Sequence, residues 1–131
     1  MAKRRLIVEM ESFGLFEPFD RKKLPKLVRF TEEIPVDPAH EFGYLLRIRG
    51  AKGKKLKFRI DHPEFRDDQG RKAPPFTGEE IINKNDYRFF LGDTFWEPLE
   101  NKAGFWELTT WIDGNEVARK GFNMVYEPSS I

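Results

Sequence analysis

Hydrophobic and polar residues alternate along most of the chain, which is the pattern of β-strands that bury one face. Residues 42–49 and 56–61 show it most clearly, because every second side chain is apolar and basic residues are common between them. Residues 105–112 and 116–126 are also predicted to be strands, and weaker candidates are residues 6–16, 27–34 and 86–91. About seven short strands separated by turns, with no helix beyond a turn or two, predict an antiparallel β-sandwich.

Two turn signals predict how these strands pair. The sequence Gly50-Ala51-Lys52-Gly53 lies between the two clearest strands and predicts that they form a hairpin. Asp113-Gly114 predicts a second hairpin, because a two-residue type I′ turn needs positive φ at both central positions. Simple pairing across that turn would direct Phe122 and Met124 away from the core. We therefore expect a β-bulge at Gly121, which directs one set of side chains into a common core: Trp106, Leu108, Val117, Phe122 and Met124.

Two stretches lack periodicity and are predicted to be loops. Residues 62–79 contain Pro63, Pro74 and Pro75 together with two glycines, and residues 92–103 contain aromatic side chains. Unstructured loops longer than about 12–15 residues are uncommon in compact domains and are often functional. The sequence therefore places a candidate site in these two loops.

The composition limits what such a domain can do. A chain of 131 residues has the length of a single domain, which we place at residues 1–131, with a core over about 5–126 and a flexible tail at 127–131. Without cysteine there are no disulfides, thiol nucleophiles, thiolate zinc sites or iron–sulfur clusters. The 23 basic and 22 acidic residues leave a net charge of +1, so no field over the whole protein favours nucleic acid.

Signals for export or membrane insertion are missing from the sequence. The basic residues 1–5 are followed by only three apolar residues before Glu9, which is too short for a signal peptide. No apolar run approaches the roughly 20 residues that a membrane span needs. We expect a cytoplasmic protein that makes no membrane contact and is a monomer or a weak dimer.

A series of short motifs resembles a known family. In chain order they are Ile34-Pro35, Glu41-Phe42-Gly43, His62-Pro63, Gly104-Phe105-Trp106, and Gly121-Phe122 followed by Val125. Their order and spacing over residues 12–126 resemble a bacterial family of unknown function that has an immunoglobulin-like β-sandwich fold. The resemblance implies that fold for this chain and implies no activity. Phe105 departs from the family pattern, in which a small residue precedes the Trp.

A basic segment is the sharpest local feature of the chain. It contains seven basic residues and no acidic one: Arg47, Arg49, Lys52, Lys54, Lys55, Lys57 and Arg59. On a hairpin these like charges would face one another and destabilise the pair, so acidic residues of a neighbouring strand or an anionic ligand should offset them. The favoured interpretation is a solvated face, and the alternative is contact with an anion or a nucleic acid.

Catalytic signals are weak. His40 and His62 are the two histidines, and the alternative in which the protein is a hydrolase would use Asp61, His62 and acidic residues of the loops. Adjacent strand residues point to opposite faces, and no metalloprotease, phosphate-binding or dinucleotide motif is present. We therefore expect no enzyme activity, no cofactor and no bound metal, and we expect His62 to anchor the loop that follows it.

Aromatic residues provide the remaining candidates. Trp106 is predicted to lie in the core, as Trp residues do in such sandwiches. Four others form a candidate interaction surface, namely Phe95, Trp96, Phe105 and Trp111. In the alternative, Phe95 and Trp96 cover the outer side chains. The sequence as a whole predicts a non-catalytic binding module whose partner is an unknown protein or carbohydrate.

Overall fold

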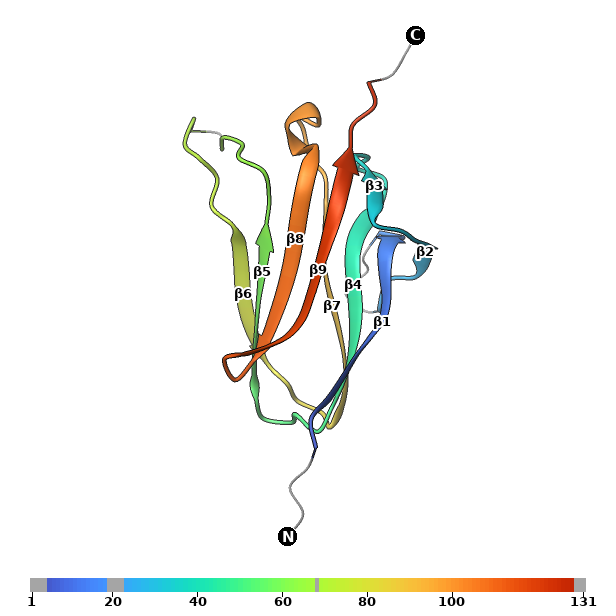
Figure 1. The fold of residues 1–131 in the computed structure, drawn as a ribbon, viewed down its shortest axis with the longest axis vertical. Coiled ribbons are helices and arrows are strands. Elements are labelled where there is room, and N and C mark those ends of the chain that lie inside the picture. Colours follow the sequence, from blue (N-terminus) through green and yellow to red (C-terminus); the bar gives the residue numbers. More distant parts are fainter. Residues whose placement is uncertain (1–4, 19–22, 68, 129–131) are drawn as a thin grey trace.

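The computed structural model describes residues 5–18, 23–67 and 69–128, which form two β-sheets packed face to face (Figure 1). The four-stranded sheet has the order β2-β1-β4-β7. Its strands are β1 (Ile7–Phe16), β2 (Leu27–Phe30), β4 (Glu41–Arg49) and β7 (Asp86–Thr94). The five-stranded sheet has the order β3-β9-β8-β5-β6. Its strands are β3 (Glu33–Pro35), β5 (Lys55–Asp61), β6 (Phe76–Ile81), β8 (Gly104–Ile112) and β9 (Asn115–Val125).

The predicted all-β sandwich is confirmed, with nine strands in the described residues rather than about seven. The predicted strand at 27–34 is divided into β2 and β3, which lie in different sheets, and β3 runs parallel to β9. The stretch 62–79, predicted to be a loop, ends in β6, which pairs with β5. The only helical element of the described residues is the short 3₁₀ turn η1 (Glu100–Lys102), and none of them forms a helix suited to crossing a membrane. Residues 129–131 of the predicted tail lie outside the described residues.

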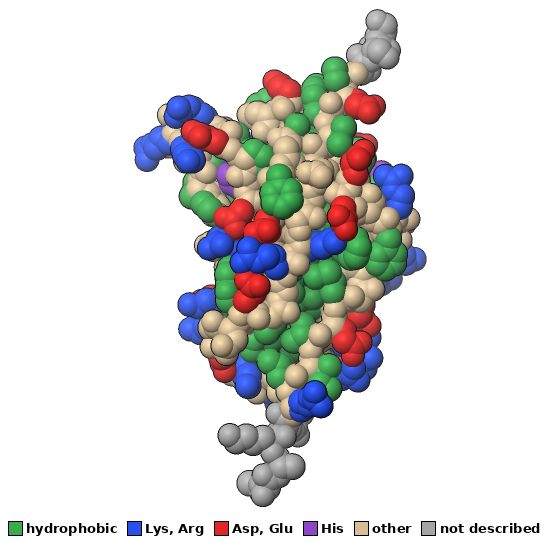
Figure 2. All heavy atoms as spheres, in the orientation of Figure 1, with side chains coloured by type: hydrophobic (Ala, Val, Ile, Leu, Met, Phe, Trp, Pro, Cys, Tyr) green, Lys and Arg blue, Asp and Glu red, His purple; other side chains and the backbone are tan. Residues whose placement is uncertain are grey.

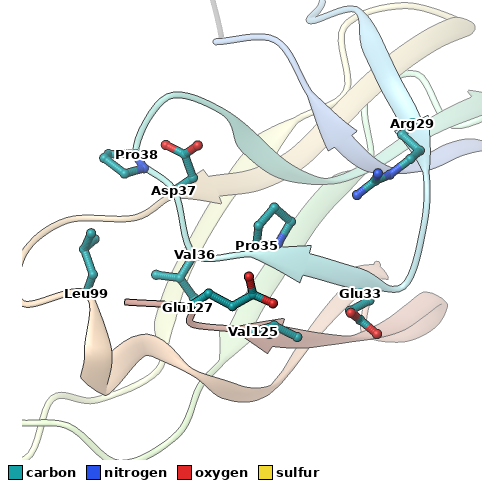
Figure 3. Close-up of a pocket in the computed structure, with 9 residues that line it drawn as sticks. All are labelled: Arg29, Glu33, Pro35, Val36, Asp37, Pro38, Leu99, Val125 and Glu127. Atoms are coloured by element: carbon teal, nitrogen blue, oxygen red, sulfur yellow. The ribbon is translucent and has the colours of Figure 1, made fainter. Parts of the chain in front are cut away.

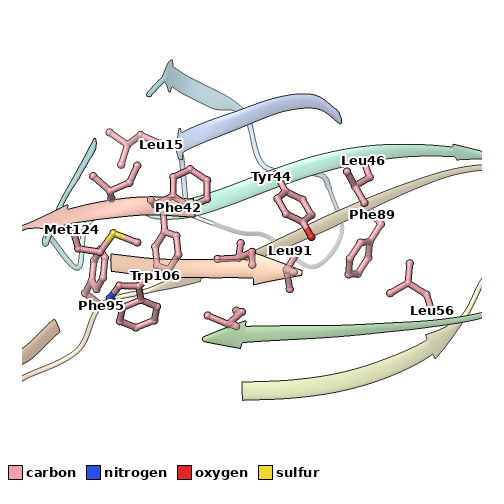
Figure 4. Packing of buried hydrophobic residues seen from close by; sticks show 14 of the residues in the cluster. Leu15, Phe42, Tyr44, Leu46, Leu56, Phe89, Leu91, Phe95, Trp106 and Met124 are labelled. Carbon is pink, nitrogen blue, oxygen red and sulfur yellow. The ribbon is translucent and has the colours of Figure 1, made fainter. Parts of the chain in front are cut away.

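The core lies between the two sheets (Figure 4). Phe42, Tyr44 and Leu46 on the inner face of β4 are fully buried, as the alternation predicts. Trp106 of β8 meets them from the other sheet, with its ring 5.4 Å from that of Phe42 in the edge-to-face arrangement that aromatic rings favour. The hydroxyls of Tyr44 and Thr110 share a hydrogen bond of 2.5 Å, which joins the sheets through the core. Burial raises the pKa of the Tyr44 phenol, because the ionised form would lose its hydration.

The hairpin predicted between residues 42–49 and 56–61 is wrong. The two strands, β4 and β5, lie in different sheets. Residues 50–54 cross from one sheet to the other, and Gly50 N and Gly53 N donate to the carbonyl oxygens of Asn85 and Ile82. The side chain of Ala51 is fully buried at this crossing. Alternation determines only which face of each strand is buried. A hairpin within one sheet and a crossing between two sheets both satisfy the same alternation.

The second predicted hairpin is present, with its bulge at another residue. Asp113 (φ 47°) and Gly114 (φ 83°) form the turn between β8 and β9. The register shifts where Thr110 pairs with Ala118 and Trp111 pairs with Glu116, so Val117 is the extra residue. Gly121 pairs regularly with Glu107. A bulge at either place brings Phe122 and Met124 to the core side with Trp106, whereas residues 118–120 take opposite faces in the two cases.

Candidate interaction surfaces

The basic segment does not form one surface. Arg47 and Arg49 belong to the four-stranded sheet, whereas Lys57 and Arg59 belong to the five-stranded sheet, and all four point outward. The two pairs are thus on opposite faces of the sandwich. The hypothesis of an anion site shared across one hairpin face therefore loses its geometric basis.

Acidic residues of neighbouring strands, and Asp61 of β5 itself, offset the repulsion. On the four-stranded sheet, Arg47 pairs with Asp86 at 2.8 Å, and Arg49 pairs with Glu9. The hydrogen bond from Arg47 holds the pKa of Asp86 below its ordinary value. On the five-stranded sheet, Arg59 pairs with Asp61, also at 2.8 Å. Figure 2 shows acidic and basic side chains interleaved across this face. On the same sheet, Arg119 of β9 pairs with Glu107 of β8 and with Glu116 of β9.

His62 anchors the loop that follows β5. Its Nδ1 lies 2.8 Å from the carbonyl oxygen of Pro63, and its Nε2 lies 2.8 Å from that of Pro74. The imidazole also stacks on Phe65, with ring centroids 4.3 Å apart. Asp61 is engaged by Arg59 on the outer face. Both imidazole nitrogens are therefore occupied by backbone, and Asp61 makes no bond to the ring in this arrangement.

Burial raises the pKa of Asp93 at the end of β7, where its carboxylate accepts a hydrogen bond of 2.8 Å from the backbone N–H of Thr94.

Within the ranges that the structure describes, no group of three or more His, Cys, Asp and Glu side chains lies close enough to hold a metal ion.

A buried lysine joins the two irregular stretches. The side chain of Lys102 is 1% exposed, and its Nζ donates to the carbonyl oxygen of Pro98 (3.0 Å) and to Asn101 Oδ1 (2.7 Å). The same Nζ lies 4.6 Å from the ring centroid of Phe65 and 4.7 Å from that of Trp96. Aromatic faces thus complete the surroundings of this cation. No sequence pattern singles out Lys102. The one sequence feature that points to this contact is the presence of an aromatic residue in each of the two loops.

Stability should depend on pH through Lys102. Burial lowers the pKa of its ammonium group, because the charged form loses water. The unfolded chain then binds a proton more tightly than the folded one, so the free energy of unfolding should rise with pH below the ordinary value of 10.5. We expect Lys102→Met to remove this rise, measured by urea denaturation from neutral pH up to the ordinary value of 10.5. The exposed Lys54→Met is the control, and parallel curves for wild type and Lys102→Met would contradict the prediction.

The four aromatic candidates are separated in space. Phe95 is 3% exposed and stacks on Phe42 in the core, so its assignment to an interaction surface is wrong. No alternation extends through 92–103 to predict its inward direction. Trp96 is partly exposed, but its ring lies against the ammonium group of Lys102. Phe105 and Trp111 share the outer face of β8, as predicted, near opposite ends of the strand.

The outer face of β8 carries the most exposed of these aromatic side chains. Phe105 is 57% exposed and lies across Gly121 of β9, where an added Cβ would come within 2.4 Å of its ring. Gly121 therefore makes the room that the large side chain of Phe105 needs. Trp111 is half-buried, and the guanidinium carbon of Arg59 lies 5.2 Å from its ring centroid. A hollow of about 360 Å³ opens beside Trp111, between β5 and β6, and includes the backbone of Gly78 in its lining.

Another pocket, which no sequence pattern indicates, lies at the end of β3 and β9 (Figure 3). It encloses about 430 Å³ and has apolar walls that include Val36 and Leu99. Arg29 reaches toward it from β2, and its acidic residues are Glu33, Asp37 and Glu127. The pocket combines three short segments that are distant in sequence, so no local motif predicts it.

Comparison with known proteins supports the fold. The crystal structure of an immunoglobulin-like protein from Pseudomonas aeruginosa superimposes with a TM-score of 0.78 at 20% identity, covering 95% of this chain and 100% of that one. Two weaker similarities have TM-scores of 0.41. One is a CARDB domain from Pyrococcus furiosus in complex with di-metal ions (14% identity, 94% of each chain). The other is the alkylpurine DNA glycosylase AlkC of Pseudomonas fluorescens bound to DNA (10% identity, 90% of this chain and 30% of that one).

Comparison of sequences shows the family. No curated protein matches the chain. A family model matches residues 4–124, which is most of the sequence. Together with the immunoglobulin-like sandwich, this match bears out the resemblance noted from the short motifs. The chain therefore belongs to the family described as domain of unknown function DUF3859.

Proposed function

We propose that this domain is a non-catalytic module that binds a protein partner through the outer face of its five-stranded sheet. The observation that carries the proposal is the β8 aromatic face, defined as Phe105, Trp111 and Arg59. Phe105 is 57% exposed, and Arg59 lies over the Trp111 ring. Aromatic residues and arginine are the side chains that most often dominate binding energy at protein interfaces.

The geometry favours a protein over a carbohydrate at this face. A sugar ring binds by stacking on an open aromatic face, and Arg59 already covers one face of Trp111 at 5.2 Å. Charged groups around the β8 aromatic face pair with one another, as Arg119 does with Glu107 at 2.7 Å. Glu107 lies between Phe105 and Trp111 on β8, so the face combines two aromatic side chains with charges that are already paired, and aromatic residues and arginine are enriched at protein interfaces.

The surroundings of His62 support a binding role over hydrolysis. A general base needs a free ring nitrogen that faces a nucleophile and a partner that orients the other nitrogen. Backbone carbonyl oxygens occupy both nitrogens here, and their effect is to fix the loop.

Site-specific photo-crosslinking tests this proposal. The tagged protein would carry benzoylphenylalanine at position 105 or, as a control, at position 7, where Ile7 lies exposed on the four-stranded sheet. In cells that naturally express the protein, we expect one main crosslinked protein from position 105 and none from position 7. The double variant Phe105→Ser, Trp111→Ser should fold normally by circular dichroism and fail to copurify that protein. Equal crosslinking at both positions, or retention by the Phe105/Trp111 variant, would contradict the proposal.

A further inference from the structure

We propose that β6 receives an extended, basic segment of the partner as an added strand, which enlarges the five-stranded sheet at its edge. This inference rests on the proposed function for the existence of a protein partner and specifies how that partner is held. Addition of a strand to an open sheet edge is a common way to bind peptides, in which backbone hydrogen bonds supply affinity and alternate side chains supply specificity.

The backbone of β6 has hydrogen-bonding groups that point away from the sheet. β6 is the last strand in the sheet order, and Figure 1 shows it at the margin of the molecule. Just after β6, Ile82 donates its N–H to Lys54 O and accepts a hydrogen bond from Gly53 N, so its backbone faces β5. The β5–β6 register is regular, and strand residues alternate in direction. The N–H and C=O groups of Thr77, Glu79 and Ile81 therefore point outward, where a new strand would pair.

The opposite edge of the same sheet, at β3, is protected against the addition of a strand, whereas the edge at β6 is not. In β3, Glu33 and Pro35 have backbone groups that face away from β9, because those of Glu32 and Val36 face it. The hydroxyl of Thr31 occupies both outward groups of Glu33, at 3.0 Å each. Pro35 has no N–H. Proteins protect edges in this way, with proline or other obstacles. The six residues of β6 contain no proline and no lysine.

Hollows lie on both sides of the β6 edge. The hollow of about 360 Å³ on the outer face includes Thr77, Glu79 and Trp111 in its lining. On the inner side, a second hollow of about 470 Å³ lies between β6 and β7, lined by Phe58 and Phe89 among others. Side chains of an added strand would alternate between these hollows, since successive residues point to opposite faces. Gly78, at the centre of β6, has no side chain that could cover the neighbouring ring of Phe58.

Charge indicates what kind of segment fits. β6 carries Glu79 on its outer face and Glu80 on its inner face, and it has no basic residue. Glu80 already accepts a hydrogen bond from Tyr87, whereas Glu79 forms a longer ion pair with Lys55, at 3.9 Å, and stays exposed, so Glu79 is the acidic group more open to a new neighbour. Pairing two copies of β6 about Glu79 would set the two carboxylates opposite each other, which is destabilising. A segment with lysine or arginine on its outer positions would place a basic group beside Glu79. Apolar residues on its inner positions would face the inner hollow lined by Phe58 and Phe89.

Two synthetic peptides of nine residues test the inference with the intact isotope-labelled protein. One alternates lysine and valine, and the other alternates glutamate and valine. We expect the lysine peptide to shift and protect the amides of Thr77, Glu79 and Ile81 and to bind about tenfold more tightly than the glutamate peptide, as one reversed cross-strand charge pair would give. Glu79→Lys should reverse the preference. Glu79→Pro removes one outward N–H without removing a bond to β5, so it should abolish binding while near-ultraviolet circular dichroism stays unchanged.

Several results would overturn the inference. These are equal binding of the two peptides, protection at β2 or β3 instead of β6, unchanged binding by Glu79→Pro, or self-association that protects the β6 amides without peptide. The last result would identify a second copy as the occupant. The crosslinking assay separates the two proposals. If the protein captured at position 105 is still captured by Glu79→Pro, strand addition fails and the proposed function stands. If position 105 captures nothing, the proposed function fails.

Discussion

Replacing Trp106 with alanine is expected to lower the free energy of unfolding by roughly 3–5 kcal/mol, the range for removing a large buried aromatic side chain. Trp106 is fully buried, and its ring meets those of Phe42 and Phe95. Its Nε1 donates a hydrogen bond of 2.8 Å to the carbonyl oxygen of Lys102, which would lose a buried partner. Because whole domains are stable by only about 5–15 kcal/mol, Trp106→Ala should unfold at much lower urea concentration. Far-ultraviolet circular dichroism in urea measures the change.

The same strand provides a matched control. Trp111 lies on the opposite face of β8 and is only half-buried, so we expect Trp111→Ala to cost about 1 kcal/mol. Equal losses for the two variants would mean that the outer face of β8 contributes to stability as the core does, and this would contradict the assignment of Trp106 to the core.

Replacing Gly43 with alanine is expected to cost about 3 kcal/mol, from steric overlap of about 1–3 kcal/mol and a sparsely populated backbone conformation of about 1–3 kcal/mol. Gly43 lies in the middle of the four-stranded sheet, with Gly14 of β1 and Gly92 of β7 directly beside it. It has φ 155°, and an added Cβ would lie 2.1 Å from the carbonyl oxygen of Leu91. That atom belongs to the backbone of β7, so β4 and β7 would have to separate. Thermal unfolding followed by circular dichroism measures the loss.

Gly53→Ala separates the two contributions. Gly53 also has positive φ, at 88°, but an added Cβ there meets no described atom within 4 Å. We expect only the conformational cost, about 1–2 kcal/mol. A Gly43→Ala variant as stable as Gly53→Ala would show that β4 and β7 accommodate the methyl group.

The predictions from sequence succeeded where a local rule determines structure. Alternation predicted that Phe42 and Tyr44 point inward, because a strand has only two faces. The Asp113-Gly114 turn predicted the β8–β9 hairpin, because few other residues accept its φ angles. The choice of sheet for β4 and β5 could not be predicted, since the crossing at Ala51 depends on packing against segments that are distant in sequence.

The candidate site was predicted in part for the same reason. Phe105 and Trp111 follow the alternation of β8 and were placed correctly on its outer face. Phe95 lies where no periodicity exists, and its direction comes from contact with Phe42. Lys102 is buried because oxygen atoms and two aromatic rings surround its ammonium group. Those groups come together only in the folded chain, so the sequence offers no pattern for them.

The strand order also bears on how the domain folds during synthesis. β8 and β9 are the last strands of the chain in sequence, yet they occupy the middle of the five-stranded sheet, between β5 and β3. While a ribosome is still producing residues 104–125, β3 has no neighbour in its sheet, and β5 has only β6. The inner faces of both strands then remain exposed to water. We expect the sandwich to close only after Val125 has emerged, so that folding follows the completion of the hairpin rather than proceeding steadily from the N-terminus.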